Sequence, residues 1–109
     1  MAPKILIVDD EENIRFTFES FLSDEGYEVK TASNLQDGKK LLAGEKFDLV
    51  FLDILLGRDS GLELLREVKE RALASPVVMI TGAPEVETAA EAVRYGAFDY
   101  IPKPVMQEN

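Results

Sequence analysis

Residues 4–10 read KILIVDD, so that four consecutive apolar residues run directly into two carboxylates. A short, continuous apolar run of this kind is typical of a strand that is buried on both faces of a parallel sheet. Asp9 and Asp10 carry like charges, and crowding raises the pKa of one of them unless something positive lies between them. The pair is therefore either a solvated loop or one half of a cation site.

The same alternation of short apolar runs and amphipathic segments continues along the chain. It predicts strands at 5–8, 27–31, 49–52, 77–80 and 98–101, and helices at 11–23, 34–42, 61–72 and 84–95. Asn34 and either Ser60 or Asp59 are expected N-caps, and Gly26 and Gly96 suit helix ends. Strands that alternate with helices in this way predict an α/β fold with a parallel sheet covered on both faces.

The helices are expected to bury one apolar face each. The first would use Ile14, Phe18, Phe21 and Leu22, and the fourth would use Val86, Ala89, Ala90 and Val93. A closing helix is expected after the last strand, but residues 103–109 are too few and too polar to form it. We therefore expect residues 1–109 to be one domain whose final helix and any output domain are absent.

Composition excludes several function classes. The chain has 109 residues and a net charge of −9, which argues against binding to nucleic acids or anionic membranes. It contains no cysteine and no histidine, which removes disulfides, thiolate or imidazole metal ligands, and imidazole catalysis. No apolar run approaches the roughly 20 residues that span a bilayer. These features fit a cytoplasmic protein.

Reactive side chains follow four of the five predicted strands. Asp9 and Asp10 follow the first, Asp53 the third, Thr81 the fourth and Lys103 the fifth. In an open parallel sheet, ligands bind beyond the carboxyl ends of the strands, where these groups would meet. Carboxylate oxygens suit a hard divalent cation, and Mg²⁺ is the expected one. Metal and lysine together would let a carboxylate attack phosphorus, and Asp53, on the central strand, is the expected nucleophile.

Each of these residues alone also has an ordinary structural explanation. Adjacent acids at a strand end are usually solvated, Asp53 could be a turn residue, and Lys103 could be a surface amine. Thr81 could be a turn hydroxyl, and Glu11 is interpreted as an acid at a helix start. Their joint placement at the ends of four strands favours the functional interpretation.

The chain resembles the receiver domain of two-component response regulators. The resemblance runs from ILIVDDEENIR (5–15) through DLVFLDILLGRDSGLELL (48–65) to VVMITGAPEVETAAEAVRYGAFDYIPKP (77–104). It implies a flavodoxin-like, five-stranded sheet in the order 2-1-3-4-5. The segment AEAVRYGAFDYIPKP (90–104) is most similar to receivers of sigma-54-dependent activators, a type of transcription regulator.

The resemblance also implies a role for each matching residue. Asp53 would accept a phosphoryl group from the phosphohistidine of a sensor histidine kinase, with Thr81 and Lys103 contacting the acyl phosphate. Mg²⁺ would be bound by Asp9, Asp10, Asp53 and the backbone carbonyl of Leu55. Thr81 and Tyr100 would form the conformational switch, and the Lys103–Pro104 bond would be cis. Any catalysis would be limited to the domain's own phosphorylation and dephosphorylation.

Two of the departures from the family pattern bear on the fold and on self-association. Gly57 stands where the family often has proline, which should make that loop more mobile. Without a closing helix, apolar surface near Phe18, Phe21 and Ile101 would be uncovered, and such patches favour self-association. We therefore expect a homodimer, formed either through the face of the fourth helix and fifth strand or through the uncovered core.

Two other functions remain open at this stage. A binding-only pseudo-receiver would never be phosphorylated, although nothing in the sequence favours it. An Asp-nucleophile phosphatase would need a second acid two residues after Asp53, and Leu55 at that position argues against this class.

Overall fold

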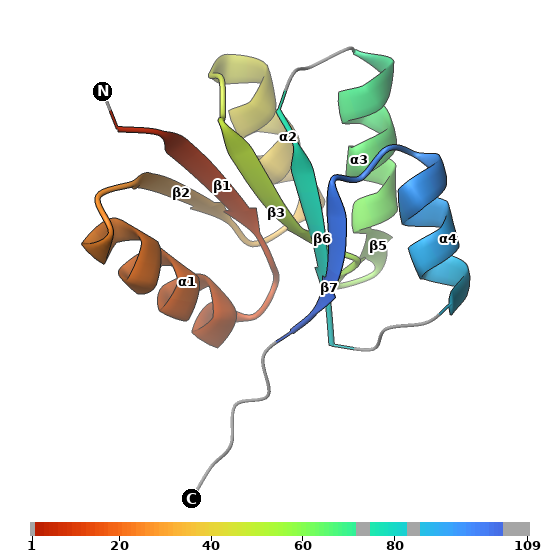
Figure 1. Ribbon diagram of the computed structural model, residues 1–109, viewed down its shortest axis with the longest axis horizontal. Helices are drawn as coiled ribbons and strands as arrows, with labels where there is room; N and C mark the ends of the chain where they lie inside the picture. The colour runs from red at the N-terminus through yellow and green to blue at the C-terminus, as the bar shows by residue number, and fades with distance from the viewer. Residues whose placement is uncertain (1, 72–74, 83–85, 104–109) are drawn as a thin grey trace, which may run out of the picture.

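The computed structural model describes residues 2–71, 75–82 and 86–103 (Figure 1). Its central sheet has five parallel strands in the order β2-β1-β3-β6-β7. These strands are β1 (Lys4–Val8), β2 (Glu28–Ala32), β3 (Leu49–Asp53), β6 (Val77–Thr81) and β7 (Asp99–Pro102). Numbered without the small hairpin β4–β5, this is the order 2-1-3-4-5, so the predicted flavodoxin-like topology is confirmed.

Four helices connect these strands, and their ends follow the predicted capping signals. They are α1 (Glu12–Asp24), α2 (Leu35–Gly44), α3 (Gly61–Glu70) and α4 (Val86–Arg94). The Asn34 side chain accepts a 2.8 Å hydrogen bond from the Asp37 N–H, and the Ser60 hydroxyl accepts one from the Leu62 N–H at 3.2 Å. Gly26 follows α1 at a φ of 94°, a conformation that glycine adopts without strain.

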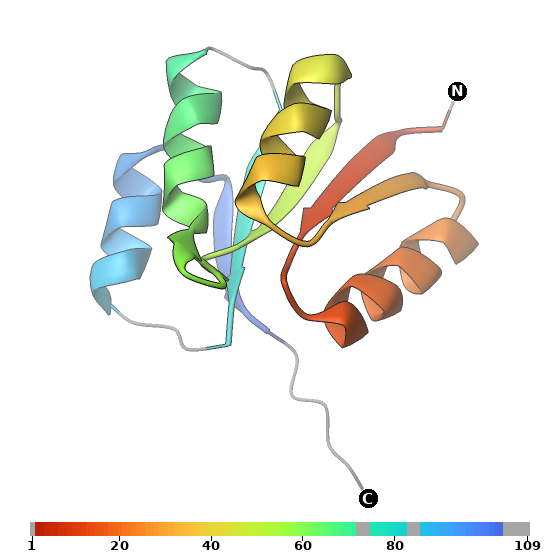
Figure 2. The same cartoon turned by 180° about the vertical axis from the view of Figure 1, so that it is seen from behind.

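The two faces of the sheet are covered unequally (Figures 1 and 2). On one face, α2, α3 and α4 pack over a continuous core; the side chains exposed by 1% or less there are Leu6, Val8, Val50, Leu52, Leu64, Met79 and Ala92. On the other face, α1 places Ile14 and Phe18 against the sheet, and the Phe18 ring stacks on Phe51 with centroids 5.6 Å apart. Among the described residues, α1 is the helix that covers this second face.

A two-stranded hairpin after β3 was not predicted. It consists of β4 (Leu55–Leu56) and β5 (Asp59–Ser60), which pair antiparallel across the two residues Gly57 and Arg58. Gly57 has a φ of 63°, which an L-residue rarely adopts. Glycine at the first position of a two-residue turn is a known hairpin signal, and it could have been read from the sequence.

Two of the predicted helix faces were wrong in part. Among the α4 side chains that the structure describes, Ala92 is the buried one, whereas Val93 is 73% exposed and Ala90 is also exposed. The predicted burial of Val86 lies outside the described side chains. The rotation of α4 places Thr88 beside Tyr100 of β7, where the two hydroxyl groups lie 2.8 Å apart. In α1, Phe21 is 63% exposed, so it does not belong to the buried face, but its exposure agrees with the uncovered apolar surface expected near this residue.

Other expectations fall beyond the described residues. The closing helix would follow Lys103, and the cis Lys103–Pro104 bond involves the first residue past that limit. Within the described part of the chain, no helix is both long and apolar enough to cross a membrane.

Candidate functional site

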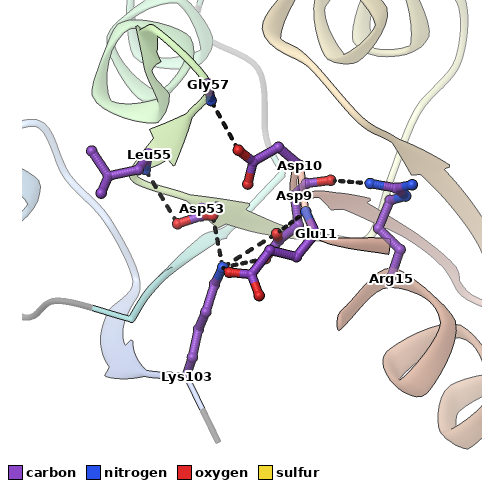
Figure 3. Close-up of polar contacts among 8 residues, drawn as sticks. All are labelled: Asp9, Asp10, Glu11, Arg15, Asp53, Leu55, Gly57 and Lys103. Atoms are coloured by element: carbon purple, nitrogen blue, oxygen red, sulfur yellow. Dashed lines mark hydrogen bonds and ion pairs between the residues drawn. The ribbon is translucent and has the colours of Figure 1, made fainter. Parts of the chain in front are cut away.

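The reactive side chains meet at the carboxyl edge of the sheet (Figure 3). The strand register brings the ends of β1, β3, β6 and β7 to one level, and the Lys103 N–H donates to the Thr81 carbonyl at 2.7 Å. An open pocket of about 330 Å³ lies there; its lining residues are Asp10, Glu11, Asp53, Leu55, Gly57, Gly82 and Lys103. Groups up to 94 residues apart in the chain thus share one site.

Lys103 is the centre of positive charge in this pocket. Its Nζ lies 2.9 Å from Asp53 Oδ2, 3.2 Å from Asp9 Oδ2 and 2.6 Å from Glu11 Oε1. The Lys103 side chain is only 8% exposed, and this burial lowers its pKa, but the hydrogen bonds that Lys103 donates to Glu11 and Asp53 outweigh burial and raise the pKa overall. The ammonium group therefore stays charged throughout the physiological range.

Asp53 is held at both oxygens. Its Oδ1 accepts a hydrogen bond from the Leu55 N–H at 3.2 Å, while Oδ2 faces Lys103. Burial raises the pKa of this carboxyl group, and the nearby Lys103 opposes that rise. The result is a buried carboxylate, aimed into the pocket, with a cation beside it.

Gly61 fixes the geometry around Asp53. It is the first residue of α3, and a Cβ built there would overlap the carbonyl oxygen of Asp53. The Gly61 N–H also donates to the Ile54 carbonyl at 2.7 Å. Only glycine lets the helix start this close to the strand end that carries Asp53.

The surroundings of the Asp9 side chain indicate whether this site fits a cation. Its side chain is fully buried, and among the described residues Oδ2 is the buried side-chain oxygen without a hydrogen-bond partner. Lys103 lies within ion-pair distance of that oxygen but directs its hydrogen bond to Oδ1 at 3.3 Å. Burial, together with the charge of Asp53, raises the pKa of Asp9 to about 6.

Four carboxylate side chains lie close together in this pocket. Asp9, Asp10, Glu11 and Asp53 each offer one oxygen, and these oxygens lie within 4.8 Å of one another. All donors are hard oxygen atoms, which is the ligand set that Mg²⁺ and Ca²⁺ prefer. The residues present therefore fit a divalent cation.

Asp10 is tied to the hairpin. Its Oδ2 accepts a hydrogen bond from the Gly57 N–H at 3.0 Å, a bond that proline at position 57 could not donate. Gly57 thus donates to one of the acids of the site, and the greater mobility expected of its loop stays a prediction.

Comparison with known proteins identifies the family. A model of the response regulator receiver domain matches residues 5–109. The chain belongs to this receiver-domain family. It is 46% identical over 101 residues to the alginate biosynthesis transcriptional regulatory protein AlgB of Pseudomonas aeruginosa. That match covers 93% of this chain but 22% of AlgB, so this receiver domain spans less than a quarter of its relative.

Solved structures agree with this assignment. A response regulator protein from Burkholderia pseudomallei, whose crystal structure contains a phosphorylated aspartic acid, a calcium ion and citrate, aligns with a TM-score of 0.89 at 34% identity, covering 95% of this chain and 61% of that chain. The beryllofluoride-activated NtrC4 receiver domain, a dimer in solution, aligns with a TM-score of 0.86 at 33% identity, covering 94% and 85%. Receiver domains bind a divalent metal ion, and the acids described above are this receiver domain's candidate ligands.

The remaining predicted site residues differ in their relation to this pocket. Thr81 ends β6 and is buried, but it is not among the described residues that line the pocket. Leu55 lines the pocket with a side chain that is 57% exposed. Tyr100 is half-buried in β7 and contacts Thr88 of α4.

Glu11, interpreted from the sequence as an acid at a helix start, also reaches across the pocket to Lys103, and no local pattern signals that contact.

Proposed function

We propose that Asp53 is the phosphoacceptor of this receiver domain and that phosphorylation there switches its conformation. The observation that carries the proposal is the 2.9 Å pair between Asp53 and Lys103 at the carboxyl edge of the sheet. It joins a buried carboxylate to a permanent cation beside an open pocket. The Asp9 oxygen beside this pair that lacks a hydrogen bond supports a metal site at the same place.

The transfer step follows from these groups. A carboxylate oxygen of Asp53 attacks the phosphorus of a phosphohistidine, the new O–P bond forms as the N–P bond breaks, and the electron pair returns to the leaving imidazole nitrogen. Lys103 pairs with one oxygen of the transferring group, and the Leu55 N–H orients Asp53. Mg²⁺, held by Asp9, Asp10, Asp53 and the Leu55 carbonyl, would neutralise charge on the phosphoryl oxygens.

The proposed switch runs from the pocket to α4. Thr81 would contact the phosphoryl group, and Tyr100 would change its position in response. The hydrogen bond between Tyr100 and Thr88 supports this route, because it links β7 directly to α4. Phosphorylation would then shift the population of two conformers toward the one that binds phosphate better.

The partners are proposed from the family and from the surface. A sensor histidine kinase would supply the phosphoryl group in the cytoplasm. The exposed α4–β7 face would mediate homodimerisation, consistent with a related receiver solved as a dimer. Because the relative AlgB is a much longer transcriptional regulatory protein, we also propose an output domain of the sigma-54-dependent activator type.

The proposal is tested by intact mass after incubation with acetyl phosphate. We expect a gain of one phosphoryl group with Mg²⁺, no gain with a chelator, and no gain in Asp53→Asn. Asp59→Asn, an exposed acid in the neighbouring hairpin, is the matched control and should be phosphorylated like the wild type. No gain in the wild type with Mg²⁺ would instead favour a binding-only receiver.

A further inference from the structure

The ammonium group of Lys103 is fully engaged in this structure. Lysine has three N–H donors, and three carboxylate groups lie within 3.3 Å of Lys103 Nζ. The shortest contact, at 2.6 Å, is with Glu11, while the contacts with Asp53 and Asp9 are 2.9 Å or longer. A phosphoryl oxygen that approaches Lys103 must therefore take the place of one of them.

The three carboxylates differ in how firmly they are held. The side chains of Asp9 and Asp53 are 0% and 3% exposed, and each also accepts a backbone hydrogen bond, from Glu11 N–H and Leu55 N–H respectively. The Glu11 side chain is 58% exposed, and Lys103 is its one hydrogen-bond partner among the described residues. Figure 3 shows it reaching Lys103 from the opposite side to Asp53. Of the three carboxylates, Glu11 is thus the one that can leave Lys103 at the smallest cost in free energy, because water can solvate it.

We propose that Glu11 is a positioning residue that occupies the Lys103 donor needed by a phosphoryl oxygen, and that it thereby restrains phosphorylation. This inference rests on the proposed role of Asp53 as the phosphoacceptor. Glu11 acts in two ways: it competes for the ammonium group, and its negative charge opposes the roughly two charges of an incoming phosphoryl group. The pocket then favours phosphate only after Glu11 has turned into solvent.

The test compares Glu11→Gln with Glu12→Gln. Glu12 is the adjacent exposed acid in the first turn of α1, so the control removes one charge at nearly the same place without touching Lys103. Three quantities are measured: the rate of phosphoryl uptake from acetyl phosphate, the concentration of beryllofluoride that half-saturates the domain, and the dissociation constant for Mg²⁺. The two anion measurements are made at saturating Mg²⁺.

For Glu11→Gln we expect phosphoryl uptake to be about three- to tenfold faster and beryllofluoride binding to be tighter by a similar factor, the size of one screened charge interaction at this range. Mg²⁺ binding should be unchanged or weaker, because a nearby carboxylate is lost. Glu12→Gln should stay within about twofold of the wild type in all three quantities. Tighter anion binding without tighter Mg²⁺ binding separates the proposed role from a structural defect, which would weaken the binding of both ions.

Three outcomes would overturn the inference. If the wild type is phosphorylated at Asp53 but Glu11→Gln takes up phosphate and beryllofluoride like the wild type, Glu11 does not restrain the reaction. If Glu11→Gln binds beryllofluoride more weakly, Glu11 supports the site rather than competing with its ligand. If the wild type itself takes up no phosphoryl group with Mg²⁺, the proposed function and this inference fail together.

Discussion

At the scale of single residues, Asp9 carries the greatest electrostatic cost in the molecule's described part. It is fully buried beside three other carboxylates and one ammonium group, and one of its oxygens lacks a hydrogen bond. Burial of a charge without full pairing is unfavourable, and the raised pKa of about 6 expresses that cost. Binding of either a proton or a cation would therefore stabilise the Asp9 side chain in the folded protein.

This cost predicts a pH-dependent stability in the absence of metal. The pKa of Asp9 rises from 3.8 to about 6 on folding, so the folded state binds more protons than the unfolded state between these values. The stabilising contribution of protonated Asp9 to the free energy of unfolding is therefore fully present below pH 3.8, and it is lost as the pH rises through 6. Compared with Asp9→Asn, the wild type should lose about 3 kcal/mol of unfolding free energy across that window.

The measurement is urea unfolding of both proteins in a chelator, from pH 4 to pH 7.5. The difference between wild type and Asp9→Asn isolates this residue from the other acids. Added Mg²⁺ should recover stability at pH 7.5 in the wild type and much less in Asp9→Asn. Parallel pH profiles for the two proteins would contradict the assignment of this cost to Asp9.

At the scale of secondary-structure elements, the site depends on where strands and helices begin and end. Asp53 is the last residue of β3, and α3 begins eight residues later at Gly61, directly against the Asp53 carbonyl. Between them, the β4–β5 hairpin holds Gly57 against Asp10. A few backbone contacts between neighbouring elements therefore set the positions of two acids.

Gly61→Ala tests the contact between α3 and β3. The added methyl group would overlap backbone atoms of Asp53, so either the helix or the strand end must shift. We expect a loss of about 1–3 kcal/mol in unfolding free energy and slower phosphoryl uptake. Gly44→Ala is the control, because nothing lies within 4 Å of a Cβ at this last residue of α2.

Urea denaturation gives the stability of both variants. Gly44→Ala should be neutral or slightly stabilising, because alanine favours the helix more than glycine does. Equal stabilities for Gly61→Ala and the wild type would mean that α3 can start elsewhere without cost.

At the scale of the whole molecule, the apolar surface is divided between two faces. Val93 on α4 and Phe98 just before β7 are 73% and 75% exposed, while Phe16 on α1 is 68% exposed. The helices α4 and α1, which carry Val93 and Phe16, pack on opposite faces of the sheet (Figures 1 and 2). Exposed apolar groups of this size are candidate contacts for another chain.

The proposed dimer surface is tested by comparing Val93→Glu with Phe16→Glu. A charge at the centre of an interface cannot be buried cheaply, so Val93→Glu should weaken beryllofluoride-dependent dimerisation by about tenfold or more. Phe16→Glu, equally exposed but on α1, should dimerise like the wild type. Sedimentation velocity with and without beryllofluoride measures both, and the reverse ranking would assign the dimer to the α1 side.

Much of this arrangement was accessible from the sequence. Apolar runs and helical periodicity predicted the five main strands and four helices, and Asn34, Ser60, Gly26 and Gly96 marked helix ends because caps depend on a few adjacent residues. The carboxyl ends of parallel strands meet at one edge, so the convergence of Asp53 with Lys103 followed from the element order alone. The hairpin at Gly57 was missed although its signal was local.

Other features depended on the tertiary structure. Glu11 and Lys103 are 92 residues apart, and their contact depends on sheet register and side-chain conformation, neither of which a local pattern contains. The rotation of α4, which places Thr88 beside Tyr100, does not follow the most apolar residues, and the need for glycine at position 61 appears only where α3 meets the Asp53 carbonyl. Sequence by itself thus determined the elements and the edge at which the acids gather, because those depend on short-range periodicity. Only the folded chain decided which charges touch, because that depends on distances between segments far apart in the sequence.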